Sequence, residues 1–307
     1  MKTEPIHLVY AGEGAVRLDK FLAEQISQLS RAKLQEMIAN GEVRLNGKVV
    51  SKPAQKLEQG DRVETVLIFE PEDELKKQAM ELDVLYEDEN VIVLNKPAGL
   101  VVHPGAGHDK NTLVNALIYH WPEIAQVGEP KRPGIVHRLD KETSGVMIVA
   151  RRQAAYEWLV RQFKTRKVQK SYLALVDGTP PTPTGRIETR IGRDEKIRQR
   201  MAVTYGEKGR KAVTEYFTRQ NFVNHTLVEA DLLTGRTHQI RVHMAFIGCP
   251  VVGDRVYGRR KPSLDLERFF LHASGLSIRL IGEKEERRFE APLPQDLQHA
   301  LEQLESK

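Results

Sequence analysis

The sequence lacks most features that mark secreted, membrane-bound and metal-dependent proteins. Cys249 is the one cysteine in 307 residues, so an internal disulfide is excluded and a reducing compartment is favoured. Residues 1–10 contain no apolar core of a signal peptide, and no apolar run approaches the ~18 residues that a membrane-spanning helix needs. The ten histidines do not show the spacing of zinc ligands. We therefore expect a soluble, cytoplasmic protein without a membrane segment or a metal site.

The excess of charge of one sign is also small, because 47 Lys and Arg residues and 42 Asp and Glu residues give a net charge of +5. The distribution is uneven. Residues 151–211 contain sixteen basic and six acidic residues, and this imbalance favours a polyanion-binding surface over an ordinary solvated face. Residues 70–89 contain nine acids and two lysines, which would repel a polyanion and suit a spacer. We place a domain boundary near residue 78, with an acidic linker at residues 76–83.

Residues 15–75 show the pattern of a small α/β module. Apolar residues recur at helical spacing in residues 18–26 and 34–38, and Asn46-Gly47 between two alternating segments is a strong hairpin signal. The basic residues of the module allow two interpretations. They are either ordinary surface charge or a basic face that lies on a phosphate backbone. In the second case the contacts would be Arg31, Lys33, Arg44 and Lys48.

The stretch Pro133–Ala150 is the most informative part of the remaining chain. Its second half, Val146–Ala150, is an unbroken apolar run with the length of a buried strand, and the segment just before it is dense in charge. A carboxylate beside a buried strand is costly unless a cation pairs with it. Asp140 is therefore either a salt-bridged structural acid or a poised catalytic acid.

A second polar segment, residues 233–244, offers a partner for this acid. A helix is expected to start at Thr237, which would place His238 and Arg241 on one face, three residues apart. A basic group inside the fold needs an acid, and Asp140 is the natural candidate; pairing with the backbone or with solvent is the alternative. An α+β fold with a mixed, largely antiparallel sheet and flanking helices is expected for residues 84–300, with strands at residues 84–86, 91–94, 170–176, 213–217 and 226–233.

Several longer motifs, taken together, resemble a known enzyme family. The main ones are His137-Arg138-Leu139-Asp140, Thr143-Ser144-Gly145, Lys170-Ser171-Tyr172 and the nine residues 235–243, with supporting motifs at residues 95–100, 253–254 and 271–273. In this order they resemble the RluA family of RNA pseudouridine synthases. Residues 17–22, 41–47 and 60–61 resemble the RNA-binding domain named after ribosomal protein S-four. The whole chain is therefore similar to the RluD-like subgroup, which modifies large-subunit ribosomal RNA.

The resemblance implies the pseudouridine synthase fold, an isomerase activity and a role for each matched residue. Such an enzyme breaks the glycosidic bond of a uridine, turns the uracil and rejoins it through C5, without a cofactor or a metal. Asp140 matches the essential aspartate, which acts as nucleophile or base at the ribose or the uracil ring. Tyr172 matches the tyrosine that packs on the base and is a candidate for removing the C5 proton. Arg241 matches the basic residue that keeps the aspartate ionised.

The resemblance also implies contacts with the substrate and a partner. Arg138 matches the arginine that fills the base stack after the uridine is flipped out, a step that costs a few kcal/mol of unstacking. Further substrate contacts are expected at His137, Arg236, His238 and Gln239. The partner would be large-subunit ribosomal RNA, free or within a pre-ribosomal particle, and the protein is expected to act as a monomer.

Two other functions would use part of the sequence. A non-catalytic RNA-binding or ribosome-assembly factor explains the basic segment and the N-terminal module, but it leaves Asp140, Tyr172 and Arg241 without a role. A Ser–His–Asp hydrolase built on Ser144 and His137 lacks the Gly-x-Ser-x-Gly elbow and leaves the basic surface unused. The isomerase is the one interpretation that uses all of these features.

Overall fold

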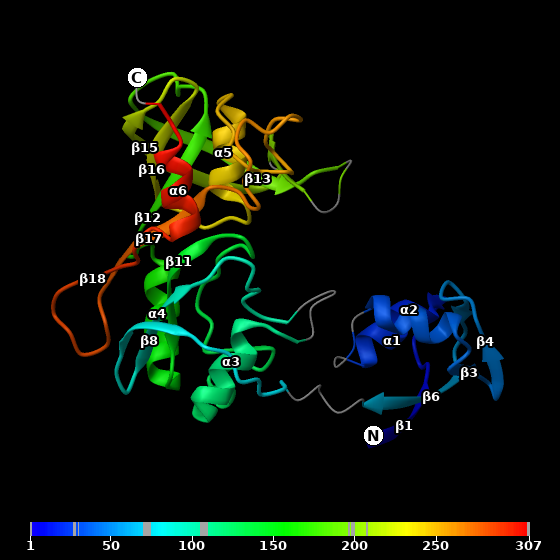
Figure 1. Ribbon diagram of the computed structural model, residues 1–307. Coiled ribbons are helices and arrows are strands. Elements are labelled where there is room, and N and C mark those ends of the chain that lie inside the picture. The colour runs from blue at the N-terminus through cyan, green and yellow to red at the C-terminus, as the bar shows by residue number, and fades with distance from the viewer. Residues whose placement is uncertain are drawn as a thin grey trace. The chain divides into compact units, whose positions relative to one another are not determined.

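The computed structural model describes residues 2–26, 29, 31–69, 75–104, 110–195, 197, 200–206 and 208–305. The chain divides into two compact units, residues 1–74 and residues 75–307, called here the N-terminal unit and the C-terminal unit. Figure 1 shows that each unit has its own sheet and its own helices. None of the helices in the described ranges has the length and apolar character that a membrane-spanning segment requires.

The N-terminal unit consists of short strands and two helices. They are β1 (Lys2–Val9), β2 (Val16–Arg17), α1 (Leu18–Gln25), α2 (Arg31–Ala39), β3 (Val43–Leu45), β4 (Lys48–Val50), β5 (Lys56–Leu57) and β6 (Arg62–Phe69). A four-stranded sheet has the order β1-β6-β3-β4, and β2 pairs with β5. Leu22 of α1 and Ile38 of α2 are fully buried in one apolar core together with Val63 of β6. The apolar faces of the two helices are therefore buried inside this unit.

The turn between β3 and β4 confirms the predicted hairpin. Asn46 and Gly47 have φ angles of 50° and 78°, the left-handed values that a two-residue type I′ turn requires. The Asn46 side chain accepts a hydrogen bond from the Arg62 N–H at 2.9 Å and donates one to Asp61 at 2.7 Å. The hairpin is therefore fastened to the start of β6 as well as closed by its own turn.

The C-terminal unit is built on a ten-stranded sheet, with strand order β14-β13-β15-β16-β12-β17-β11-β8-β7 and β18 paired to β17. Its strands are β7 (Asp83–Glu87), β8 (Val91–Lys96), β11 (Ser144–Ala150), β12 (Gln169–Asp177), β13 (Thr184–Arg193), β14 (Met201–Thr204), β15 (Arg210–Asn221), β16 (His225–Leu232), β17 (Leu271–Ile278) and β18 (Arg287–Glu290). Its other elements are α3 (Leu113–His120), the 3-10 helix η1 (Pro122–Gln126), the separate pair β9 (Gly128–Glu129) and β10 (Arg132–Pro133), α4 (Gln153–Lys164), α5 (Gln239–Phe246) and α6 (Gln295–Glu302).

The described strands of this sheet pair antiparallel, except that β11 runs parallel to β17 at Ser144 and Gly145. Gly145 has a φ of 115°, and a Cβ at this position would lie 2.1 Å from the carbonyl oxygen of Ala273. Glycine is therefore required where the two strands approach. The sheet is mixed and largely antiparallel with flanking helices, which confirms the predicted α+β class.

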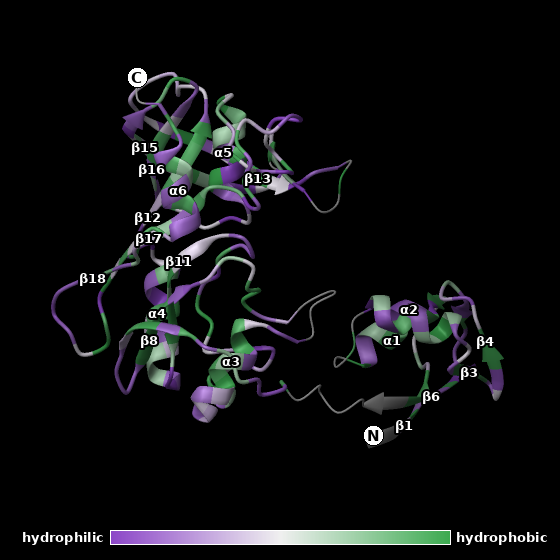
Figure 2. Cartoon of the chain, in the orientation of Figure 1, coloured by the Kyte–Doolittle hydropathy of each residue, from purple (hydrophilic) through white to green (hydrophobic). Residues whose placement is uncertain are grey.

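The apolar residues of this unit gather on the strands. The predicted strand Val146–Ala150 lies within β11, and each of its residues is at most 2 % exposed. Figure 2 shows apolar residues along β8 and neighbouring strands, whereas α4 and α6 carry hydrophilic residues as well. Because β11 is buried along its whole length, the polar loop that precedes it is attached to the rigid centre of the sheet.

The expected acidic linker at residues 76–83 does not have the form of a free spacer. The Gln78 N–H donates to the Asn115 carbonyl at 3.1 Å, and the Asn115 side chain donates to the Lys76 carbonyl at 2.7 Å. Leu75 and Leu82 pack against the core of the C-terminal unit. These two apolar residues explain why the segment lies on α3 despite its acidic composition, and no helical turn forms at residues 75–82. Residues 70–74 lie outside the described residues.

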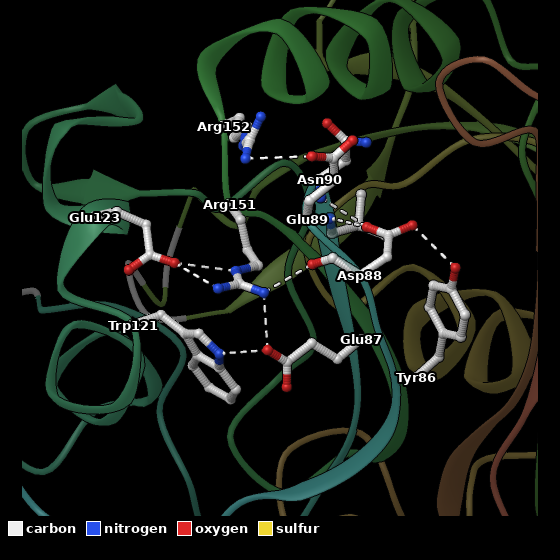
Figure 3. Close-up of polar contacts among 10 residues, drawn as sticks. Tyr86, Glu87, Asp88, Glu89, Asn90, Trp121, Glu123, Arg151 and Arg152 are labelled. Carbon is white, nitrogen blue, oxygen red and sulfur yellow. Dashed lines mark hydrogen bonds and ion pairs between the residues drawn. The ribbon is translucent and has the colours of Figure 1, made fainter.

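The chain leaves β11 through a polar clamp centred on Arg151 (Figure 3). The Arg151 guanidinium donates to Glu87 at 2.8 Å, to Glu123 at 2.7 Å and to the carbonyl of Asp88 at 2.8 Å. Trp121 Nε1 donates to the same Glu87 carboxylate at 2.9 Å. The clamp ties the C-terminal end of β11 to the β7–β8 turn and to η1. The clamp therefore fixes the C-terminal end of β11, and the loop with Asp140 precedes the N-terminal end of the same strand.

Candidate active site

A pocket of about 450 Å³ opens in the C-terminal unit where three segments meet. These are residues 136–143 ahead of β11, residues 163–172 from the end of α4 into β12, and residues 232–241, which lead from β16 into α5; Leu271 of β17 completes the lining. Among the described residues that line the pocket, six are Lys or Arg and one is an acid, Asp140. The lining also brings together all the site residues predicted in this unit, namely His137, Arg138, Asp140, Tyr172, Arg236, His238, Gln239 and Arg241.

The Asp140 loop, residues 137–143, is fastened through its backbone. The Asp140 carbonyl accepts a hydrogen bond from the Thr143 N–H at 3.1 Å, and the Lys141 carbonyl accepts one from the Gly99 N–H at 2.9 Å. The Asp140 carboxylate accepts a hydrogen bond from Arg241 Nη1 at 3.1 Å, and its side chain is 20 % exposed. The carboxylate is therefore held by a cation on one side and open to the pocket on the other.

Arg241 is the centre of the charge arrangement behind Asp140. Its guanidinium donates to both oxygens of Asp254, at 2.7 and 3.0 Å, in addition to its bond to Asp140. Its guanidinium carbon lies 4.2 Å from the ring centre of Phe269 and 5.1 Å from that of Tyr257. Bidentate pairing and two aromatic neighbours fix the orientation of the guanidinium, so that one N–H points at Asp140. The predicted contact between Arg241 and Asp140 is confirmed.

Asp254 is the functional neighbour whose role the sequence analysis missed. Burial alone would raise the pKa of Asp254, but hydrogen bonds and charge from Arg241 hold that pKa below its usual range. The Asp254 carboxylate also accepts hydrogen bonds from the N–H groups of Val256 and Tyr257, at 2.9 and 3.1 Å. Its place beside the apolar pair Val251–Val252 was the available signal, because an acid next to a buried segment needs a cation.

His238 reaches Asp140 by a route that differs from the predicted one. α5 begins at Gln239, and His238 precedes it with a φ of 57°, in the left-handed region. The expectation that His238 and Arg241 share a helix face is therefore wrong. The left-handed turn instead places His238 Nε2 3.9 Å from Asp140 Oδ2. Such a conformation is uncommon outside glycine and is often found at functional sites.

A short chain of hydrogen bonds orients the His238 ring. The Met201 N–H donates to the Tyr257 hydroxyl oxygen at 2.8 Å, and the Tyr257 hydroxyl lies 2.9 Å from His238 Nδ1. We assign the Tyr257 O–H as donor to Nδ1, because Nδ1 is an acceptor within reach of the one proton of this hydroxyl. Burial and the charge of Arg241 lower the pKa of His238, with Asp140 opposing. A neutral ring in this tautomer presents its Nε2–H toward Asp140.

Tyr172 contributes a buried aromatic ring to the pocket. It lies on β12 and is 7 % exposed. Burial, and then the charge of Asp140, raise the pKa of the Tyr172 hydroxyl well above its usual range. The phenol is therefore neutral near pH 7, where it can serve as an aromatic platform and exchange a proton but does not carry a stable negative charge.

The geometry excludes a Ser–His–Asp triad built on Ser144 and His137. Ser144 Oγ pairs with His272 Nδ1 at 2.9 Å, and the other ring nitrogen of His272 lies 3.1 Å from the Ala291 carbonyl. His137 Nε2 accepts a hydrogen bond from the Ile148 N–H at 3.0 Å, and its ring stacks on Phe163. Burial and the charge of Lys170 lower the pKa of His137 to about 3, so the ring is neutral. Ser144 and His137 therefore belong to two separate hydrogen-bond systems.

The remaining predicted substrate contacts differ in how free their side chains are. The Gln239 amide oxygen accepts from the Thr234 hydroxyl and the Arg236 N–H, and its nitrogen donates to the Val213 carbonyl and the Thr214 hydroxyl. These four bonds use the whole hydrogen-bonding capacity of the amide and close the turn before α5. That Gln239 contacts the substrate stays a prediction. Arg138 is exposed at the pocket, and Arg236 donates to the Lys211 carbonyl at 3.0 Å.

In the N-terminal unit, the four residues predicted to bind RNA fall into two pairs. Arg31 donates to the buried carboxylate of Asp19 at 2.9 Å, and Lys33 forms an ion pair with Glu36 at 3.2 Å. A hydrogen bond from Arg17, and further ones from Gln35 and Arg31, hold the pKa of Asp19 well below its usual range. Burial of the carboxylate acts in the opposite direction. Arg44 and Lys48 are exposed on the β3–β4 hairpin. Arg31 thus has a structural partner, whereas the hairpin residues face solvent.

Lys96 supports the Asp140 loop from inside the protein. It is 1 % exposed, and its ammonium donates to the carbonyls of Pro97, Leu100 and Lys141, at 2.8, 2.9 and 3.1 Å. Burial lowers the pKa of Lys96 to about 7, with the charges of Glu142 and Asp140 opposing. The three protons of a charged ammonium match the three carbonyls, so this residue joins the 97–100 turn to the Asp140 loop.

Replacing this ammonium should destabilise the loop. Lys96→Met leaves three carbonyl groups without their donor, and we expect the free energy of unfolding to fall by about 2–4 kcal/mol. Lys141→Met is the matched control, because its side chain is exposed while its carbonyl is retained. Urea unfolding of the two variants measures the difference. Equal stability of both variants would show that the Lys96 ammonium does not hold the loop.

Comparisons with known proteins agree with this site. The family model described as RNA pseudouridylate synthase matches residues 90–246, and the S4 domain model matches residues 16–63. An uncharacterized RNA pseudouridine synthase of Bacillus subtilis, YlyB, is 45% identical over 94% of this chain and 94% of its own length. The ribosomal large subunit pseudouridine synthase D of Vibrio parahaemolyticus is 40% identical over 94% of this chain and 90% of its own length.

A solved structure supports the same assignment. Human RNA Pseudouridylate Synthase Domain Containing 4 superposes with a TM-score of 0.56 at 28% identity, covering 73% of this chain and 94% of that chain. In the described ranges, no group of three or more His, Cys, Asp or Glu side chains is arranged to hold a metal ion. From the matched models, the relatives and the pocket around Asp140, it follows that this chain belongs to the RNA pseudouridylate synthase family and carries an S4 domain.

Proposed function

We propose that this enzyme isomerises uridine to pseudouridine in large-subunit ribosomal RNA. The observation that carries the proposal is the Asp140–Arg241 pair, 3.1 Å apart, in a pocket that also contains Tyr172 and five further Lys or Arg residues. A reactive carboxylate, an aromatic platform and a cationic lining are what a uridine within an RNA chain requires. Relatives named ribosomal large subunit pseudouridine synthase D support the choice of RNA.

The reaction exchanges one bond of the ribose for another. The C1′–N1 bond breaks, the uracil turns, and a C1′–C5 bond forms while C5 loses its proton and N1 gains one. Asp140 begins this sequence at either the ribose or the uracil ring, and Arg241 holds its carboxylate toward the substrate. Tyr172 packs on the uracil as it turns. The walls of the pocket keep the detached base close to C1′, so the second bond forms before the base escapes.

Access to the pocket requires the uridine to leave its stack. Arg138 is exposed beside Asp140, and we propose that its guanidinium fills the space that the flipped uridine leaves in the RNA. The exposed hairpin residues Arg44 and Lys48 of the S4 domain are proposed to contact the RNA backbone. We further propose that the protein works as a cytoplasmic monomer on free RNA or on a pre-ribosomal particle.

Removal of the N-terminal unit should separate RNA affinity from folding. A protein of residues 75–307 is expected to keep a cooperative unfolding transition, because each apolar core of this unit is made by its own residues. Its affinity for RNA should fall by roughly tenfold or more, since one of two linked binding surfaces is lost. Calorimetry and filter binding test the two statements. Loss of the unfolding transition would show that the C-terminal unit depends on residues 1–74.

The proposed RNA target is tested by mapping the product. Purified protein is incubated with large-subunit and small-subunit ribosomal RNA, each offered as free transcript and as assembled particle, and pseudouridine is located by chemical labelling and primer extension. New pseudouridine in large-subunit RNA is the expected result. Pseudouridine in small-subunit RNA alone would contradict the target. Tight binding without any product on every RNA would favour the alternative of a non-catalytic RNA-binding factor.

A further inference from the structure

Lys170 is a cation of the pocket that the proposed reaction leaves without a role. It lies on β12 two residues before Tyr172, and alternate residues of a strand project from the same face of a sheet. Its ammonium makes one long hydrogen bond, 3.5 Å, to the Thr234 carbonyl. Among the described residues no carboxylate lies within ion-pair distance of this ammonium. Lys170 is therefore partly removed from water without an acid to compensate.

The neighbours of Lys170 in the pocket are also basic. Arg236, Arg166 and Lys164 line the same pocket, and Arg236 donates to the Lys211 carbonyl at 3.0 Å. Within the described chain, these three side chains likewise form no ion pair. The charge of Arg236 acts on Lys170, and that of Arg166 acts on Arg236. Burial and the charge of Arg236 lower the pKa of Lys170 to about 8. Burial, followed by the charges of Arg210 and Arg166, also lowers the pKa of Arg236.

Two other cations of the same sheet are paired with acids. Arg186 on β13 pairs with Glu215 on β15 at 2.9 Å, and Arg219 on β15 pairs with Glu229 on β16 at 2.7 Å. Asp140, the acid of the pocket, is already bonded to Arg241. An exposed lysine often has no partner. In a half-buried lysine near other cations, by contrast, lost hydration and charge repulsion both destabilise the charged ammonium. An anion of the substrate would compensate this excess of positive charge.

We propose that Lys170, together with Arg236 and Arg166, forms a phosphate subsite that binds a backbone phosphodiester next to the target uridine. This inference rests on the proposed function, because the phosphate belongs to the RNA substrate. Several converging charges match a phosphate, whereas a uracil carbonyl needs a single neutral donor. Lys170 and Tyr172 on one strand face would then hold the phosphate and the base of the same region of the RNA, which fixes the position of the uridine before Asp140 acts.

The subsite has a pH dependence with a definite sign. Only the charged ammonium attracts a phosphate, and the pKa of Lys170 in the free protein is about 8. RNA affinity should therefore fall as the pH rises from 7 to 9. His137 and Arg236 are the titratable or charged groups that face Lys170, and neither changes charge in this range, since the pKa of His137 is about 3 and arginine stays protonated.

The experiment uses the full-length protein and a large-subunit ribosomal RNA transcript. Affinity and single-turnover rate are measured at pH 7 and pH 9 for the native protein, Lys170→Met, Lys170→Arg and the control Lys167→Met, whose side chain is exposed outside the pocket. We expect Lys170→Met to bind roughly tenfold more weakly at pH 7 and to lose about one unit of salt slope. Its rate at saturating RNA should also fall, by roughly threefold or more, because the uridine is then less well positioned for Asp140. Lys170→Arg should keep its affinity at pH 9.

Three outcomes would overturn the subsite. They are unchanged affinity of Lys170→Met, an equal loss in Lys167→Met, and an alkaline loss of affinity that persists in Lys170→Arg. Thermal unfolding of each variant shows whether a loss of affinity reflects loss of folded protein. If the native protein binds the RNA with the expected pattern but forms no pseudouridine, the proposed function fails while the phosphate subsite stands.

Discussion

Asp140→Asn is expected to lower the rate of pseudouridine formation by roughly 10³-fold or more, because the amide is neither a nucleophile nor a base. The amide has nearly the shape of the carboxylate and can still accept the hydrogen bond from Arg241 Nη1. Arg241 also keeps its two bonds to Asp254. Nucleoside analysis of RNA digested after single-turnover reactions measures the rate.

The same variant should keep its fold and its affinity for RNA. Its thermal midpoint is expected within a few degrees of native, because no buried group loses its partner. Affinity should stay equal or rise slightly, since a negative charge leaves a basic pocket. A variant that forms pseudouridine at the native rate would show that Asp140 has a structural role. If the thermal midpoint of the variant were far below that of the native protein, unfolding rather than the lost carboxylate would explain the loss of activity.

Arg241→Met is expected to have the largest effect on stability. It leaves the carboxylate of Asp254, which is 0 % exposed, without its bidentate partner. Breaking a buried ion pair from one side costs about 3–5 kcal/mol, because the remaining charge is desolvated and unpaired. In a unit of this size such a loss lowers the thermal midpoint by roughly 10 °C. Urea and thermal unfolding measure the loss, and pseudouridine formation should be absent at temperatures where the variant is folded.

The double variant Arg241→Met with Asp254→Asn separates the two consequences. Removing the second charge should restore much of the stability, since a buried pair replaced on both sides is often tolerated. Activity should stay absent, because nothing then holds Asp140 toward the substrate. If the double variant is no more stable than the single one, the charge of Asp254 is not the source of the loss. If it regains activity, Arg241 is not needed to position Asp140.

Local patterns in the sequence were sufficient for several elements. Val146–Ala150 is an apolar run bounded by polar residues, and it forms the fully buried strand β11. The Asn46-Gly47 turn was predictable because few residues adopt two successive left-handed conformations. The Asp140–Arg241 contact was predictable because a charge inside a fold needs a partner of opposite sign. Each of these inferences uses a rule that acts within one segment or one charge pair.

Features that depend on tertiary packing were not predictable in the same way. His238 adopts a left-handed conformation next to Gln239, whose amide makes four hydrogen bonds to Thr234, Arg236, Val213 and Thr214. No spacing rule reports such a network, so a continuous helix from Thr237 was the better prediction from periodicity. The acidic segment 75–82 lies on α3 because two leucines bury there, which net charge alone does not show.

The most direct test is tritium release from large-subunit ribosomal RNA that carries tritium at uridine C5. Isomerisation through C5 must release that proton, and binding or hydrolysis of the RNA does not. Native protein and Asp140→Asn are compared at concentrations that give equal RNA occupancy. Release by the native protein and none above background by Asp140→Asn is the predicted result. Equal release by both would contradict the central role of Asp140, and no release by native protein bound to free RNA and to assembled particles would contradict the isomerase itself.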